Sequence, residues 1–158
     1  MSTPRVTGVF KTCMKTASNT VRFVALLALL NFVWEIAQLP LYTIWRDGSW
    51  GEIVFAIAHC TAGDVLIGIF SAGGAALLTG LHGKGRAEAP AAFIASFVMI
   101  GVSYTVFSEW LNVVVRKSWA YSSFMPTVPP LDTGLSPILQ WIFVPVLAWW
   151  FTKGRAKA

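Results

Sequence analysis

Four stretches of this chain remain apolar for about the length that a helix needs to cross a lipid bilayer. They cover residues 21–45, 53–81, 90–115 and 136–152. A membrane-crossing helix needs about 20 mostly apolar residues, because the hydrocarbon core is about 30 Å thick and each helical residue adds about 1.5 Å. Charged residues make up only 12% of the 158 residues, whereas soluble domains contain about 25%. The sequence therefore predicts an all-α integral membrane bundle of four transmembrane helices.

The basic residues predict the orientation of this bundle, since Lys and Arg gather on the cytoplasmic side of membrane proteins. Nine of the twelve lie in or beside the N-terminal segment 1–20, in the connection after the second span, or in the tail 153–158. The other two connections hold only Arg46, Arg116 and Lys117. We expect both termini to be cytoplasmic (N-in/C-in), with residues 5–20 forming either a basic interfacial helix or an irregular tail. The basic residues flank apolar spans and form no aromatic-rich patch, so no nucleic-acid partner is expected.

Two spans carry further structural signals. Pro40 is expected to kink or end the first span near the interface, because proline lacks the backbone N–H that a helix needs. The second span is rich in alanine and glycine, which allow close approach of helices in lipid. We therefore expect it to be the central helix of the bundle.

Four ionisable side chains lie in or near the spans, and each is a candidate catalytic group: Glu35, His59, Asp64 and Glu109. An ionisable residue inside a membrane costs about 2.5–3.5 kcal/mol on insertion scales, so it usually faces protein or a cavity. Counting about 1.5 Å per residue places all four in the outer half of the bilayer. His59 and Asp64 are about 140° apart around their helix, so one of them is expected to act indirectly.

Carboxamides lie at the same expected depth. Gln38 follows Glu35 by three residues and shares its helix face, and Gln140 reaches the matching depth on the fourth span. Asn112 and Arg116 follow Glu109 at helical spacing and predict a second polar stripe. We expect an outward-opening polar pocket that is lined by Glu35, Gln38, His59, Asp64, Glu109 and Asn112.

The connection 118–137 combines aromatic residues with four prolines. Proline stiffens a chain without helix, and aromatic rings favour the headgroup region. The segment is expected to be either a lid over the pocket or an interfacial anchor. In the lid interpretation Trp119 and Tyr121 join Gln38, Asn112 and Gln140 as substrate-binding residues.

The spacing of the donor residues predicts no metal site. Glu, His and Asp are suitable ligands for zinc or iron, but the chain has no HxxxH, ExxH or CxxC motif. Haem ligation by two histidines is not expected either, because only His59 lies in a span. The sequence leaves the identity of any other cofactor open.

Several segments carry a family resemblance. NFVWEIAQLPLYTIW, HCTAGD and SEWLNVVVRKSWAYSSFMP, followed by GLSPILQW, resemble an uncharacterised family of small four-span bacterial inner-membrane proteins. This resemblance covers most of the chain from residue 31 and implies a bacterial inner-membrane location. An acidic residue followed by W-x-Y and a proline-containing loop is more distantly similar to carotenoid hydratases and small-subunit lycopene cyclases. That similarity implies matching positions at Glu109, Asn112, Trp119, Tyr121 and Pro126, but the paired-glutamate motif of the cyclases is absent.

These observations favour a membrane enzyme that acts on a lipid or isoprenoid from the outer leaflet by general acid–base chemistry. Glu35 and Glu109 would be the acid and the base, tuned by His59 or Asp64, because low dielectric favours protonated carboxyl groups. One alternative is an accessory subunit that binds a partner membrane protein. Another is a small proton or ion transporter, which would have to be a homo-oligomer because four helices enclose little space.

Overall fold

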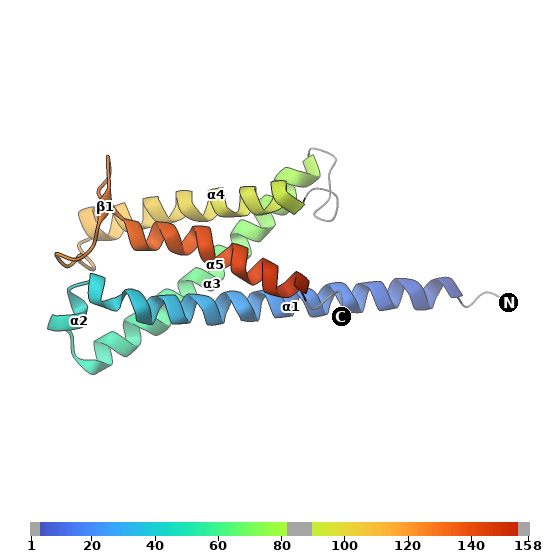
Figure 1. Ribbon diagram of the computed structural model, residues 1–158, viewed down its shortest axis with the longest axis horizontal. Helices are drawn as coiled ribbons and strands as arrows, with labels where there is room; N and C mark the ends of the chain where they lie inside the picture. Colours follow the sequence, from blue (N-terminus) through green and yellow to red (C-terminus); the bar gives the residue numbers. More distant parts are fainter. Residues whose placement is uncertain (1–3, 82–89, 155–158) are drawn as a thin grey trace.

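The computed structural model describes residues 4–81 and 90–154 and is an all-α bundle (Figure 1). Its long helices are α1 (Pro4–Gln38), α3 (Trp50–Leu81), α4 (Pro90–Glu109) and α5 (Leu135–Gly154). The stretches long and apolar enough to cross a membrane are Ser18–Leu41, Trp50–Gly80, Pro90–Val115 and Leu135–Lys153. The predicted four-helix membrane bundle is therefore confirmed. Lys84, Arg86, Arg155 and Lys157, which contribute to the predicted orientation, lie outside the described residues.

The helices form a ring in which α3 and α5 each pack against both α1 and α4. α3 and α5 consequently face each other across the axis of the bundle, and α3 runs obliquely to its neighbours (Figure 1). The connections 39–49 and 116–134 lie together at one end, which we call the loop end. The C-terminal end of α5 lies toward the other end, which we call the terminal end (Figure 1).

Proline sets the end of the first helix. α1 ends at Gln38 and is followed by η1, a 3₁₀ turn (Leu39–Leu41) with Pro40 near its start. The chain then enters the short helix α2 (Ile44–Asp47) before α3 begins. The expected effect of Pro40 is thus observed, and residues 42–45 lie beyond the first span instead of within it.

An apolar core fills the terminal half of the bundle. The Phe97 ring lies at its centre, 5.9 Å from the Phe23 ring and 6.2 Å from the Trp141 ring, measured between centroids. Gly101 leaves room for the Trp141 indole, which is 2% exposed. The core consists of Phe23, Leu27, Ala75, Phe93, Phe97, Trp141, Val144 and Ala148. The polar side chains near the loop end therefore meet a mainly apolar core on the terminal side, beside which Ser71 is also buried.

The expectation that the second span is the central helix is wrong. Only 11% of the apolar window in α3 is buried, compared with 39% in α5. Many of its small residues face outward: a Cβ added at Gly63, Gly73 or Gly80 would meet nothing within 4 Å. Composition shows that close helix packing is allowed, but it does not show which face of the helix is packed.

The connection 116–134 is fixed across the loop end by backbone hydrogen bonds. Thr43 N donates to Ala120 O (3.0 Å), and Ser122 N donates to Leu41 O (2.9 Å). Further along, strand β1 (Thr127–Val128) pairs antiparallel with strand β2 (Thr133–Gly134). The connection therefore covers the loop end through contacts with the segment that follows α1. Its exposed Phe124 side chain is also suited to the headgroup region.

Candidate functional site

Gln140 links α5 to α1 and α3 at a buried polar cluster. Its Nε2 donates toward Asn31 Oδ1 (3.0 Å), Glu35 Oε1 (3.1 Å) and Asp64 Oδ2 (2.8 Å). Gln38 adds a bond from its Nε2 to Glu35 Oε1 (2.8 Å). Since Asp64 lies on α3 and Gln140 on α5, the cluster crosses the bundle axis.

The two carboxyl groups of this cluster share one amide donor. Gln140 Nε2 lies 3.1 Å from Glu35 Oε1 and 2.8 Å from Asp64 Oδ2, so the two carboxyl groups meet at a single side chain. Neither group has a basic side chain as a hydrogen-bond partner in the described part of the chain. Neutral amides therefore hold both buried carboxyl groups in place.

Glu109 forms a second group at the loop end. It is the last residue of α4 and is 8% exposed. The Tyr121 hydroxyl donates to Glu109 Oε2, and the same hydroxyl accepts a bond from Gly134 N (2.9 Å). The Tyr42 ring packs against the Tyr121 ring with centroids 5.6 Å apart, and the buried Trp119 Nε1 has no hydrogen-bond partner among the described residues. Glu109 therefore accepts a hydrogen bond from a phenol, whereas Glu35 and Asp64 accept from amides.

The two groups lie near the same end of the bundle. Glu35 is three residues before the end of α1 and Glu109 is the last residue of α4, and both helices end at the loop end. Cys60 is one turn from Asp64 on the same face of α3, as the four-residue spacing requires. The acidic residues of three helices consequently belong to one polar layer near the loop end.

Two of the expected site residues lie elsewhere. His59 is exposed on the outer face of α3, where its ring stacks on Phe55 with centroids 5.4 Å apart. The 140° offset accounts for this position, because turning Asp64 toward the axis turns His59 outward. Asn112 donates to Ser108 O of its own chain segment (2.9 Å).

A change of helix type explains the position of Asn112. After Glu109 the chain continues as η2, a π-helix (Trp110–Val115), in which Arg116 N donates to Leu111 O (2.8 Å). The wider i→i+5 turn breaks the three- and four-residue spacing of an α-helix. The predicted stripe of Glu109, Asn112 and Arg116 therefore does not form, and Arg116 is exposed.

The predicted pocket lining did not include three residues that complete the polar layer. Asn31 is 1% exposed and shares a helix face with Glu35. Ser136 donates to Gln38 Oε1 (2.9 Å) and accepts from Trp34 Nε1 (3.2 Å). Its four-residue spacing from Gln140 is the signal that indicates it. Tyr42 lies in a connection, so no helical periodicity could have identified it.

The donor set gives no metal centre in the part of the chain that the structure describes. There, no group of three or more His, Cys, Asp or Glu side chains is arranged to hold a metal ion. The carboxyl pair instead bonds to carboxamides, and Glu109 to a phenol. The outward pocket remains a prediction, because the cluster side chains contact one another directly.

Tyr121 gives the loop end a pH dependence that can be measured. Burial raises the pKa of its phenol above the ordinary value, and the bond to Glu109 raises it further. The folded protein therefore retains this proton more tightly than the unfolded chain, so the stabilisation is complete below about pH 10 and is lost as the pH rises further. We expect the tyrosinate absorbance of Tyr121→Phe to lack a component that titrates well above pH 10 in the wild type. Loss of amplitude near pH 10 instead would contradict this assignment.

Comparisons of the chain with protein-family models, with curated protein sequences and with solved structures give no match.

Proposed function

We propose that this protein is a bacterial inner-membrane enzyme that performs acid–base chemistry on an apolar lipid or isoprenoid reaching it from the loop end. The observation that carries the proposal is the pair of buried carboxyl groups Glu35 and Asp64, linked through Gln140, beside the acceptor Glu109. Proton transfer needs one group that gives a proton and another that accepts it. Carboxyl groups with different hydrogen-bond partners can fill these two roles.

The proposed orientation places this layer near the outer surface. Arg46, Arg116 and Lys117 are the basic residues of the loop-end connections, against nine in or beside the remaining segments. The resulting bias favours a periplasmic loop end and cytoplasmic termini. A substrate dissolved in the outer leaflet would then reach the polar layer without crossing the membrane.

The distribution of apolar side chains favours an enzyme over a transmembrane proton path. The Phe97-centred core lies between the acid pair and the terminal end. Within it, Leu27 is 1% exposed and Phe97 0%. A proton path would have to cross this layer, whereas an enzyme needs access from one side only.

The chemistry can be written with no co-reactant. A proton from the Glu35–Asp64 pair adds to one carbon of a double bond, and Glu109 removes a proton from a carbon next to the other. The double bond moves by one position, and the two carboxyl groups exchange a proton to restore the starting state. Isoprenoids are suitable substrates because protonation of their branched double bonds gives tertiary cations. The similarity to carotenoid hydratases and lycopene cyclases points to the same substrate class.

Deuterium exchange tests this proposal without knowledge of the individual substrate. The purified chain is reconstituted into vesicles of bacterial lipid extract in D₂O, and the isoprenoid and lipid fractions are analysed by mass spectrometry. We expect wild-type protein to introduce carbon-bound deuterium. Asp64→Asn, Glu35→Gln and Glu109→Gln should each lower the rate by about 100-fold or more, since a positioned acid or base contributes about 10²–10⁴.

His59→Gln is the matched control, because it removes an ionisable group from the same helix but from its exposed face. This variant should exchange at the wild-type rate. Deuterium uptake that is equal in wild-type and Asp64→Asn vesicles would refute the acid–base role. A wild type that moves protons across the membrane with no labelled product would instead identify a transporter, and loss of a co-purifying protein in the variants would identify an accessory subunit.

A further inference from the structure

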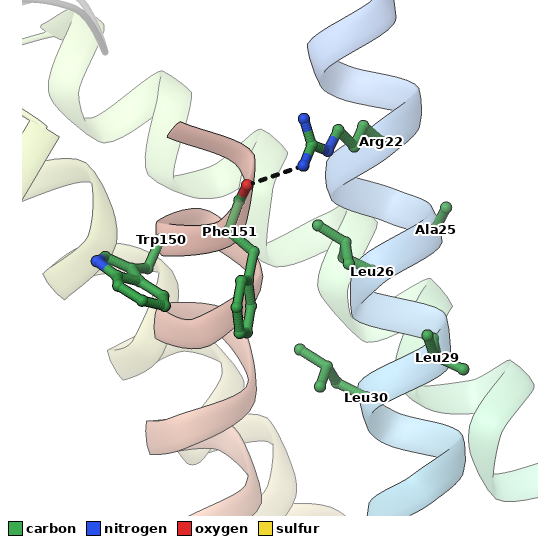
Figure 2. A pocket seen from close by; sticks show the side chains of 7 residues that line it. All are labelled: Arg22, Ala25, Leu26, Leu29, Leu30, Trp150 and Phe151. Carbon is green, nitrogen blue, oxygen red and sulfur yellow. Dashed lines mark hydrogen bonds between the residues drawn. The ribbon is translucent and has the colours of Figure 1, made fainter. Parts of the chain in front are cut away.

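A groove lies between α1 and α5, on the outside of the bundle and away from the carboxyl cluster. It encloses about 640 Å³. Figure 2 shows Leu26 and Leu30 of α1 directed toward Phe151 of α5 across this space. The lining residues are Arg22, Ala25, Leu26, Leu29, Leu30, Trp150 and Phe151. The groove is thus apolar along its length and has one cation.

Arg22 lies at the end of the groove nearest the terminal end of the bundle. One of its Nη atoms donates to Phe151 O (3.1 Å), a carbonyl in the last turn of α5 (Figure 2). This bond holds the guanidinium over the groove and uses one of its five N–H donors. No acidic side chain pairs with Arg22 within residues 18–80 and 90–153, so the other donors are directed at the surroundings of the helices.

The depth of Arg22 matches the phosphate layer of a bilayer. It is four residues inside the span that begins at Ser18, which is about 6 Å along a helix. An arginine side chain is long enough to extend from there to the interface while its stem lies among acyl chains. A cation at headgroup depth above an apolar groove is complementary to an anionic phospholipid and to its acyl chain together.

We propose that the α1–α5 groove binds one anionic phospholipid, with the phosphate on Arg22 and an acyl chain along Leu26, Leu30 and Phe151. This site is independent of the proposed acid–base function, because the Phe97-centred core separates the two. In the proposed orientation, the lipid belongs to the cytoplasmic leaflet.

Lipid retention tests the site directly. The full chain is reconstituted with equal amounts of phosphatidylglycerol and phosphatidylcholine of the same acyl composition, extracted in mild detergent and analysed by native mass spectrometry. We expect the wild type to retain phosphatidylglycerol about fivefold over phosphatidylcholine, which is the effect of one interfacial cation. Arg22→Gln should abolish this preference, and Arg22→Lys should keep most of it.

Two further pairs of variants separate a local site from general attraction to charge. Lys153→Gln removes a cation from the same end of the bundle. The Lys153 Nζ lies 4.1 Å from the centroid of the Trp149 ring, and Lys153 does not line the groove. This variant should keep the fivefold preference. Leu26→Trp fills the groove and should lower retention of both lipids, whereas Leu66→Trp on the exposed face of α3 should not. Equal loss in Arg22→Gln and Lys153→Gln, or a wild type without preference, would overturn the proposal.

Discussion

Gly101→Ala is expected to destabilise the folded bundle by about 3 kcal/mol, at the upper end of the range for overpacking. A Cβ at this position would overlap Cε3 of the Trp141 indole and would lie 2.8 Å from its Cδ2. The indole is rigid and fully enclosed, with the Phe97 ring stacked beside it. Neither α4 nor the indole can therefore move without opening the core elsewhere.

The midpoint of heat- or denaturant-induced unfolding in detergent, followed by circular dichroism, measures this effect. Gly73→Ala is the matched control, since it introduces the same methyl group into a helix at a position where nothing lies within 4 Å. Alanine costs less backbone entropy than glycine, so this control should be neutral or more stable by about 0.5–1 kcal/mol. Equal destabilisation by the two substitutions would show that Gly101 is not in contact with Trp141.

Gln140→Leu is the second large effect that we expect, at about 2–3 kcal/mol of lost stability. The substitution keeps the approximate volume but removes the amide that donates toward Asn31, Glu35 and Asp64. A buried acceptor that loses its donor lowers the stability of the folded protein by about 1–3 kcal/mol.

Asn112→Leu is the control for this measurement. It also removes a carboxamide from a span, but Asn112 bonds only within its own segment, to Ser108. Polar contacts in membrane proteins are worth about 0.6 kcal/mol on average, so the control should lose little. If Gln140→Leu lost no more stability than Asn112→Leu, the cluster would not hold the helices together.

The helices and the depth of the polar layer could be predicted from the sequence. Each span follows from the length of an apolar run, and the face shared by Glu35 and Gln38 follows from their spacing. Both signals are local, and a helix keeps its periodicity whatever packs against it. Gln140 could be placed at the same depth for the same reason.

The partners of these residues could not be predicted, because they depend on how each helix is rotated and on where helical periodicity fails. α3 turns Asp64 toward the axis and His59 outward, a choice that its even distribution of small residues leaves open. The π-helix after Glu109 displaces Asn112 from the expected stripe. Tyr121 reaches Glu109 through a connection whose path depends on backbone bonds to residues 41–43.

The length of α1 has a practical consequence. Its 35 residues extend for about 52 Å, which is about 20 Å more than the hydrocarbon core can cover. The helix emerges from the terminal end as a single rod (Figure 1), so a spectroscopic label on its first turns would be carried at a set height above the lipid. Distances from such a label to the bilayer surface would report the tilt of the whole bundle.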